Sequence, residues 1–484
     1  MINRLIKSFA AQTITFALDL IKTILLVPFF LSNWGLETYG SYISCFSFLA
    51  LLMSLDNGFG MYVSNEYNLL YHKNVSKAKL LISSALKVVI LSNLIQTIFV
   101  FLLIMIQLNF SFFFINIKIL YALLVLCFYR LLFGSTKGLL VKTLFPIGYF
   151  HRSSLIGSSE KIVEILVLIP FVIYSNSFLN AIIFISIFKS IYCLVSLFLI
   201  NKWTKLSFFK IRKNGKLSEG LMMYKKSIPL MFNSFFDKSS NDGINSIISI
   251  TIGPIFLPIY TTTKTLSNIL LKFVNLIFHA IIPEYGRLYS KNQIEKIVIT
   301  FKVAILLITI AFLPMLFFSY YSEDIYNFWL NNELEFNAIL FGTLISSSFI
   351  YMYGKIFINY FVSINHVPAL TIISLTRGLG ILSLAYIFLS FFGINGLGWS
   401  NLIAEVFSLI LICFLVYKFW ENKSQFFSNM DICIYLINIL LILLGLFIST
   451  NFNSLFLIIT ISLIILIFNF KSIKKTFKSF IINK

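Results

Sequence analysis

Ionisable and amide side chains recur at helical spacing inside apolar stretches of this chain. In residues 8–32, Gln12, Thr15, Asp19 and Lys22 follow one another at steps of three and four, so they share one face of a helix. An ionisable group at bilayer depth costs roughly 2.5–3.5 kcal/mol on insertion scales, and it normally faces the protein interior or a water-filled cavity. The stripe therefore predicts a polar surface inside a membrane.

Two further polar stripes have the same character. Residues 228–252 and 258–282 carry them, and we expect all three stripes to line one central cavity. Their members are Asn233, Asp237, Lys238, Asn241, Asp242 and Asn245 in the former range, and Thr261, Lys264, Thr265, Asn268, Lys272 and Asn275 in the latter.

The chemistry expected of this cavity is the binding of an anion. Charge-assisted contacts between desolvated Lys or Arg side chains and phosphate are strong. We predict that five cations contact such a cargo: Lys22, Arg130, Lys238, Lys264 and Lys272. Asp19, Asp237 and Asp242 are expected to balance these cations or to couple transport to an ion.

Other charges within the apolar stretches fit buried ion pairs better than a ligand site. Lys161 and Glu164 stand three residues apart, which predicts a pair on one helix. Lys355, Arg377 and Glu405 are isolated in the sequence.

The sequence gives no support for catalysis, for a cofactor or for a metal site. The five cysteines lack C-x-x-C spacing, the four histidines are scattered, and the nucleotide-binding pattern G-x-x-x-x-G-K-[ST] is absent. No pairing of a nucleophile with a base is evident. We therefore expect no enzyme activity, no metal and no cofactor.

Composition identifies the elements that must position these residues. Of 484 residues, 59% are hydrophobic and only 12% are charged, which is too little charge to cover a soluble protein. With about 20 apolar residues per span, the sequence predicts an all-α polytopic membrane protein of about 14 transmembrane helices. The predicted spans are 8–32, 41–62, 80–107, 118–137, 154–175, 180–201, 228–252, 258–282, 297–320, 337–363, 369–392, 396–418, 432–449 and 454–470.

Loop charges orient these helices. The loops expected outside, such as 33–40, 176–179 and 321–336, contain no Lys or Arg, whereas Lys and Arg gather in the intervening loops and at both ends of the chain. The positive-inside rule then places both termini in the cytoplasm. The same distribution accounts for the net charge of +20 without a nucleic-acid partner. A cleavable signal is not expected, because the first apolar stretch is long and carries two charges.

The two halves of the chain resemble each other. Residues 65–74 and 283–292 agree at six of ten positions, and the same offset of 218 residues aligns Asp19 with Asp237, Gly35 with Gly253 and Tyr42 with Tyr260. An even number of spans separates the equivalents, so the repeat is parallel. We expect two pseudo-symmetric six-helix lobes around a central cavity, followed by two C-terminal helices. The domains are then 1–201, a basic cytoplasmic linker 202–227, 228–419, and 420–484 with a basic tail.

Short motifs spread along the chain resemble those of one transporter family. W-G-L-E-T-Y-G (34–40), L-D-N-G-F-G (55–60), N-E-Y (65–67), I-G-P-I-F-L-P-I-Y (252–260), I-I-P-E-Y-G-R-L-Y (281–289) and G-I-N-G-L-G-W-S-N-L-I-A-E (393–405) are similar to the Wzx-type polysaccharide (O-antigen) flippases. These belong to the multidrug/oligosaccharidyl-lipid/polysaccharide (MOP) exporter superfamily.

The resemblance implies a function in the bacterial inner membrane. The cargo would be an undecaprenyl-pyrophosphate-linked oligosaccharide, moved from the cytoplasmic to the periplasmic leaflet by alternating access. An H⁺ or Na⁺ gradient would drive the cycle. Expected partners are the lipid-linked oligosaccharide, membrane lipid and other polysaccharide-assembly proteins.

Two alternatives stay open. One is a small-molecule or drug antiporter of the same superfamily, which twelve spans would favour and a cationic cavity disfavours. The other is a membrane O-antigen polymerase or ligase, for which a large periplasmic loop would be expected, whereas the longest outside loop predicted here is 321–336.

Overall fold

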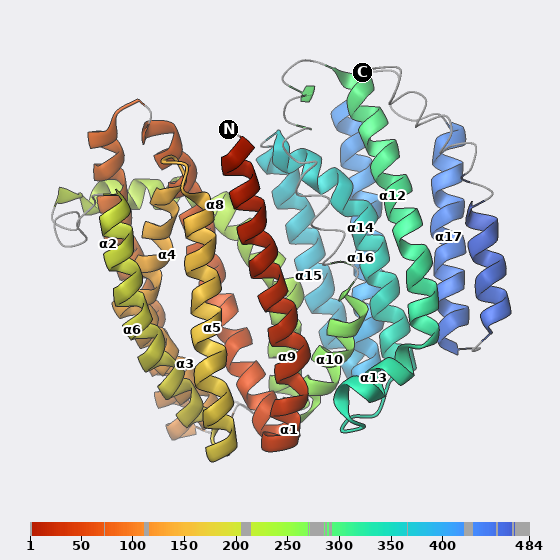
Figure 1. The fold of residues 1–484 in the computed structure, drawn as a ribbon, viewed down its shortest axis with the longest axis horizontal. Coiled ribbons are helices and arrows are strands. Elements are labelled where there is room, and N and C mark those ends of the chain that lie inside the picture. Colours follow the sequence, from red (N-terminus) through yellow and green to blue (C-terminus); the bar gives the residue numbers. More distant parts are fainter. Residues whose placement is uncertain are drawn as a thin grey trace. The chain divides into compact units, whose positions relative to one another are not determined.

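The computed structural model is almost entirely helical and divides into two compact units, Met1–Pro258 and Ile259–Lys484 (Figure 1). It describes residues 2–71, 73–110, 116–204, 214–269, 293–364, 366–420, 429–451 and 454–466, together with positions 271, 285, 288, 289 and 469.

The first unit begins with two helical segments that meet at one glycine. Both lie in α1 (Ile2–Tyr71), and Gly35 between them has φ 70° and ψ 179°, a conformation that a residue with a Cβ rarely adopts. The predicted spans 8–32 and 41–62 are these two segments. The chain therefore turns at the glycine of the W-G-L-E-T-Y-G motif.

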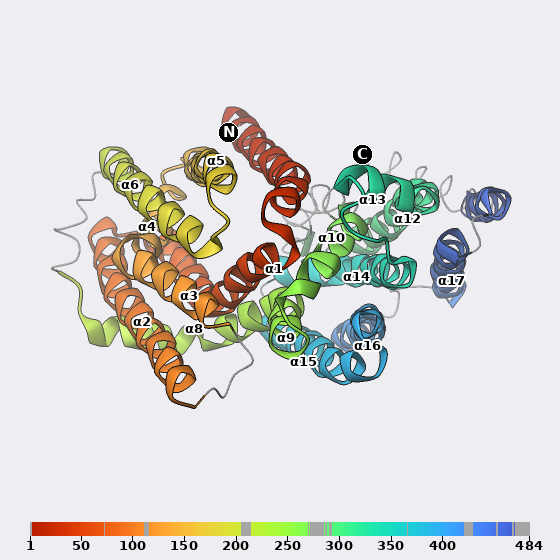
Figure 2. The ribbon, with the colours of Figure 1, turned by 90° about the horizontal axis from the view of Figure 1, so that it is seen from below.

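Four further helices of this unit contact α1. They are α2 (Val75–Phe110), α3 (Ile117–Tyr129), α5 (Phe150–Tyr174) and α6 (Phe178–Thr204), and each packs against α1 (Figure 2). Between α3 and α5 the chain passes through a π-helical turn η1 (Arg130–Gly134), then α4 (Ser135–Val141) and the 3₁₀ turn η2 (Lys142–Leu144). A π turn widens a helix by one residue and is common at functional sites.

The helix predicted as the seventh span also belongs to this unit. It comprises α8 (Leu217–Lys238), a second π turn η3 (Ser239–Gly243) and α9 (Ile244–Thr251). Its backbone lies so close to α1 that a Cβ on Gly58 would stand 2.5 Å from the Met231 Cα. By its contacts this helix packs with residues 1–201, although it opens the second predicted lobe. The two six-helix lobes stay a prediction.

Two glycines that the predicted internal repeat aligns have similar backbone geometry. Gly253, which precedes the short turn η4 (Pro254–Phe256), has φ 97° and ψ 161°, close to the values of Gly35. The aligned Tyr42 and Tyr260 are both buried. The alignment at an offset of 218 residues thus joins positions with the same local structure.

One close packing contact in the first unit allows no side chain. A Cβ on Gly40 would lie 1.8 Å from the Pro254 carbonyl oxygen, which is backbone and cannot simply move aside. We expect Gly40→Ala to lower the free energy of unfolding by about 1–3 kcal/mol, the usual cost of overpacking. Thermal unfolding of the purified protein measures it. Gly157→Ala is the matched control, because its Cβ would meet nothing within 4 Å; equal stability of both variants would contradict the close approach.

The second unit is built around one buried helix. α14 (Ala338–Ser363) lies against α12 (Ile294–Tyr320), α15 (Val367–Phe392), α16 (Ile394–Trp420) and α17 (Asn429–Asn451). α10 (Leu257–Ser267) begins where the chain enters this unit, and α13 (Ser322–Leu330) follows α12. Tyr360 of α14 is fully buried among the aromatic rings of Phe301, Phe361 and Trp420. A last apolar helix spans Leu455–Leu466.

The described helices make this a multi-pass membrane protein. Eight are long and apolar enough to cross a bilayer, namely those within Thr13–Tyr71, Val75–Asn109, Ile117–Leu144, Phe178–Thr204, Ile294–Tyr320, Ala338–Ser363, Val367–Phe392 and Ile394–Trp420. The first of these contains two predicted spans. α5 carries Glu160, Lys161 and Glu164 in its middle turns and is not among the eight. The all-α prediction is confirmed, and the number of fourteen spans stays a prediction.

Candidate functional site

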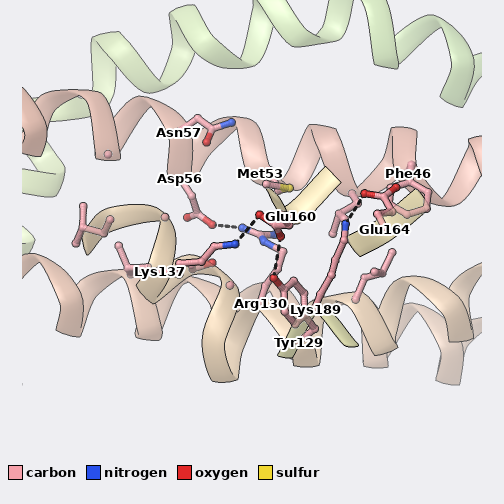
Figure 3. Close-up of a pocket in the computed structure, with 18 of the residues that line it drawn as sticks. Phe46, Met53, Asp56, Asn57, Tyr129, Arg130, Lys137, Glu160, Glu164 and Lys189 are labelled. Carbon is pink, nitrogen blue, oxygen red and sulfur yellow. Dashed lines mark hydrogen bonds and ion pairs between the residues drawn. The ribbon is translucent and has the colours of Figure 1, made fainter. Parts of the chain in front are cut away.

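A strongly charged cavity of about 460 Å³ lies within the first unit (Figure 3). It is lined by α1, α2, the α3–η1–α4–η2 stretch, α5 and α6. The ionisable residues in its wall are the cations Lys22, Arg130, Lys137, Lys142 and Lys189 and the carboxylates Asp56, Glu160 and Glu164. Five cations face three carboxylates, so the wall carries a formal excess of two positive charges.

Arg130 is held by a buried polar cluster on α1 and α2. Its guanidinium pairs with the Asp56 carboxylate and donates a 3.0 Å hydrogen bond to the Gln96 side chain. Asp56 also accepts hydrogen bonds from Ser92 at 2.8 Å and from Asn93 at 3.3 Å. Because the charged pair is satisfied by several hydrogen bonds at once, this cluster ties η1 to two helices.

Glu164 of α5 lies between two ammonium groups. Lys22 of α1 approaches one carboxylate oxygen at 2.5 Å, and Lys189 of α6 approaches the other at 2.8 Å. All three side chains line the cavity, and Glu164 is buried. One carboxylate cannot neutralise two ammonium groups, so this cluster contributes a net positive charge to the wall.

Lys137 occupies the far end of the cavity from Glu164 in Figure 3. Its ammonium lies 2.5 Å from the Glu160 carboxylate, which also accepts a hydrogen bond of 3.2 Å from the Tyr129 hydroxyl. The ammonium stands 5.5 Å from the centre of the Tyr192 ring. This pair joins α4 to α5 and is electrically balanced.

Lys142 is the cation of this wall that lacks a carboxylate partner among the described residues. Its ammonium lies against Gly60 of α1, and a Cβ on that glycine would stand only 2.6 Å away. The missing side chain of Gly60 therefore makes the room that the ammonium occupies. An anion entering the cavity would find here a positive charge that is not already neutralised.

A second cavity of about 420 Å³ adjoins the first and shares Lys22, Phe46 and Glu164 with it. The two segments of α1 form most of its wall, and η3 and α9 complete it with Asp242 and Asn245. The other lining residues are Asp19, Thr23, Leu26, Val27, Phe30, Tyr39, Tyr42, Ile43 and Ser47. Both Asp19 carboxylate oxygens lie 2.6 Å from the Lys161 ammonium.

The structure describes four of the five cations predicted to share one site. Lys22 and Arg130 both line the first cavity. Lys238 is exposed beside Asp242, with 3.8 Å between their charged atoms, and is not part of that wall. Lys264 belongs to the second unit, where its ammonium lies 3.2 Å from the Tyr260 hydroxyl. The prediction for Lys272 falls outside the described residues.

The three carboxylates predicted to balance the cations do not all line the same cavity. Asp19 and Asp242 both line the second cavity. Asp237 is exposed on the last turn of α8. The functional roles assigned to these carboxylates and cations stay predictions.

Of the expectations about ion pairs, one is wrong and one is confirmed. Lys161 and Glu164 do not form a pair with each other, because neighbouring helices offer each a closer partner, Asp19 and the two lysines described above. Arg377 and Glu405, which are far apart in the sequence, form a buried ion pair as expected, at 2.6 Å between α15 and α16. The Arg377 guanidinium also stacks 4.2 Å from the Tyr351 ring, whose hydroxyl accepts a hydrogen bond from Lys355.

Sequence reasoning missed Lys137, Lys142 and Lys189 as cavity residues. Lys137 is the last residue of the predicted span 118–137 and Lys142 lies in the basic stretch predicted to follow it, yet α4 and η2 prolong that helix to Leu144. The i,i+7 spacing of Arg130 and Lys137 was a usable signal, since it places both on one helical face.

The fold is shared with known membrane transporters, although neither a protein-family model nor a curated protein sequence matches the chain. The lipid II flippase MurJ, in an inward closed conformation, aligns over 98% of this chain and 100% of its own at 16% identity, with a TM-score of 0.67. The MATE multidrug transporter DinF-BH, solved as a complex, aligns over 88% of this chain and 95% of its own at 17% identity, with a TM-score of 0.60.

A third similar structure is a MOP-superfamily transporter from Pyrococcus furiosus, whose description states a reverse polarity of its binding pocket. It aligns over 85% of this chain and 95% of its own at 15% identity, with a TM-score of 0.59. This chain is thus a multi-pass membrane protein with the fold of the MATE transporters and of the flippase MurJ.

Proposed function

We propose that this protein is a Wzx-type flippase that moves an undecaprenyl-pyrophosphate-linked oligosaccharide across a bacterial inner membrane, from the cytoplasmic to the periplasmic leaflet. The observation that carries the proposal is the positive excess in the wall of the first cavity, five cations against three carboxylates. Lys142 and Lys22 are the proposed contacts to the pyrophosphate, and Arg130 positions the wall through its pair with Asp56.

Such a cargo has a charged, polar head group and an apolar prenyl chain, which suits a charged cavity inside an apolar membrane protein. A pyrophosphate and a glycan cannot enter hydrocarbon without a large loss of hydration free energy, whereas a polyprenyl chain is soluble in hydrocarbon. A cavity of about 460 Å³ is within the size range of small-ligand sites. It would hold the charged head group while the prenyl chain stays in lipid. Opening of the cavity to each side in turn, driven by an H⁺ or Na⁺ gradient, would complete the cycle.

A drug antiporter of the same superfamily is the alternative. The structural match to the multidrug transporter DinF-BH is the observation in its favour. The sign of the first cavity favours the flippase, because an excess of positive charge repels lipophilic cations. The extent of the fold points the same way, since MurJ aligns over 98% of this chain and DinF-BH over 88%.

Reconstitution tests the proposal directly. The purified full-length protein is placed in proteoliposomes with undecaprenyl-pyrophosphate-linked trisaccharide, and the fraction that becomes accessible on the opposite leaflet is followed with an impermeant periodate reagent. We expect translocation well above that of empty vesicles, and no uptake or efflux of the cationic dye ethidium. Translocation of the dye but not of the lipid-linked sugar would refute the flippase proposal and support the antiporter.

Orientation is tested separately in cells. Single cysteines in 33–40, 176–179 and 321–336 should react with an impermeant maleimide from outside, because these loops lack Lys and Arg, whereas cysteines in 202–227 should react only after the membrane is permeabilised. The comparison is made in a background in which the native cysteines are replaced. Labelling of 202–227 in intact cells would reverse the proposed direction of transport.

A further inference from the structure

We infer that the second cavity is a subsite for the neutral sugar next to the pyrophosphate. The inference rests on the proposed function and deepens it, because it assigns the two ends of one head group to two adjoining cavities. The first observation is continuity: Lys22, Phe46 and Glu164 line both cavities, so a ligand in one lies directly beside the other. Figure 3 shows Phe46 and Glu164 together at one end of the first cavity.

The second observation is a difference in the ionisable groups of the two walls. The first wall has five cations and three carboxylates, whereas the second has one cation, Lys22, and three carboxylates, Asp19, Glu164 and Asp242. Lys161 and Lys189, which do not line the second cavity, pair with Asp19 and Glu164 and offset their negative charge. Carboxylates only accept hydrogen bonds. The second wall therefore offers acceptors without the excess of cations found in the first, and it suits a ligand rich in donors, such as sugar hydroxyls.

The third observation is the apolar side of the same wall. Phe30, Tyr39, Tyr42 and Phe46 line it, and their rings pack on one another, with 5.3 Å between the centroids of Phe30 and Tyr39 and 4.8 Å between those of Tyr42 and Phe46. The face of an aromatic ring is electron-rich, and it attracts the weakly positive C–H groups on one side of a pyranose ring. A wall with acceptors on one side and aromatic rings on the other matches both surfaces of a sugar.

The fourth observation concerns Asn245 of α9, which lines this cavity. Its amide nitrogen donates a 3.1 Å hydrogen bond to Ser47 of α1, while its carbonyl oxygen is buried without a partner among the described residues. An unmade hydrogen bond of a buried amide is costly. Turning this oxygen toward a sugar hydroxyl would satisfy it, so Asn245 is the residue whose loss should affect sugar binding most selectively.

Binding of two lipid probes to the full-length protein in nanodiscs tests the inference. One probe is undecaprenyl pyrophosphate, and the other is the same lipid carrying one neutral hexose. We expect the native protein to bind the hexose probe more tightly. Asn245→Ala should reduce affinity for the hexose probe about fivefold to tenfold, the effect of one hydrogen bond to a neutral group, and leave affinity for undecaprenyl pyrophosphate unchanged.

Controls keep this test separate from the test of the proposed function. Thr251→Ala alters an exposed residue of α9 that does not line the cavity and should bind both probes like the native protein. Equal affinity of the native protein for both probes would overturn the sugar subsite and leave the flippase proposal intact. Failure to bind either probe would instead refute the flippase proposal. If Asn245→Ala changes the Na⁺ or H⁺ dependence of binding and not the sugar preference, the cavity holds the coupling ion and the sugar subsite is wrong.

Discussion

Lys142→Gln should lower the affinity for undecaprenyl pyrophosphate by about 10- to 100-fold and reduce translocation of the lipid-linked oligosaccharide in proportion. The magnitude is that of one hydrogen bond to a charged group, about 1.5–3 kcal/mol. The effect is expected to be large because the Lys142 ammonium has no carboxylate partner among the described residues, so no protein anion competes with the ligand for it. Binding in nanodiscs and translocation in proteoliposomes measure it.

Three variants separate charge from fold in this experiment. Lys142→Arg keeps the charge and should retain part of the activity. Gly60→Ala keeps the lysine but displaces its ammonium, which would otherwise lie 2.6 Å from the new Cβ, and should give an intermediate loss. Lys118→Gln removes an exposed lysine on the same helical stretch and should behave like the native protein. Native affinity in Lys142→Gln would show that the unpaired ammonium does not bind the cargo.

Glu164→Gln should destabilise the protein by about 3–5 kcal/mol, the usual cost of removing one partner of a buried ion pair. The reason is specific to this site: the substitution leaves two ammonium groups, those of Lys22 and Lys189, facing a neutral amide in a buried position. Thermal unfolding in detergent and the yield of monodisperse protein measure the loss.

The arrangement of the cluster also predicts how the loss can be repaired. Adding Lys189→Gln to Glu164→Gln removes one uncompensated charge and should recover part of the lost stability, so the two changes should not be additive. Glu323→Gln, at an exposed glutamate of α13, should leave stability within about 0.5 kcal/mol of the native protein. Simple additivity of the two cluster changes would mean that the carboxylate does not hold the two lysines together.

Helix positions followed directly from the sequence, because an apolar stretch of about 20 residues has one stable structure in a bilayer. The predicted spans from 80–107 to 454–470 coincide with described helices wherever the structure describes them. The equivalence of Gly35 and Gly253 was also predictable, since the offset of 218 residues aligns them. In the structure both glycines adopt positive φ. What the hydropathy pattern missed was the extension of the fourth span beyond residue 137, through the end of α4 and η2 to Leu144, because charged residues interrupt it.

The sequence by itself determined that this is an all-helical membrane protein with charges buried in its helices, since insertion costs force such groups toward the interior. Only the tertiary structure decided which charges meet. Asp19 and Lys161 pair across 142 positions in the chain, Glu164 lies between lysines of two other helices, and Lys142 faces a cavity that its position after a span did not suggest. Helical periodicity places a residue on a face of its own helix, but the partner opposite that face depends on how neighbouring helices rotate and cross, which is a property of the packed fold.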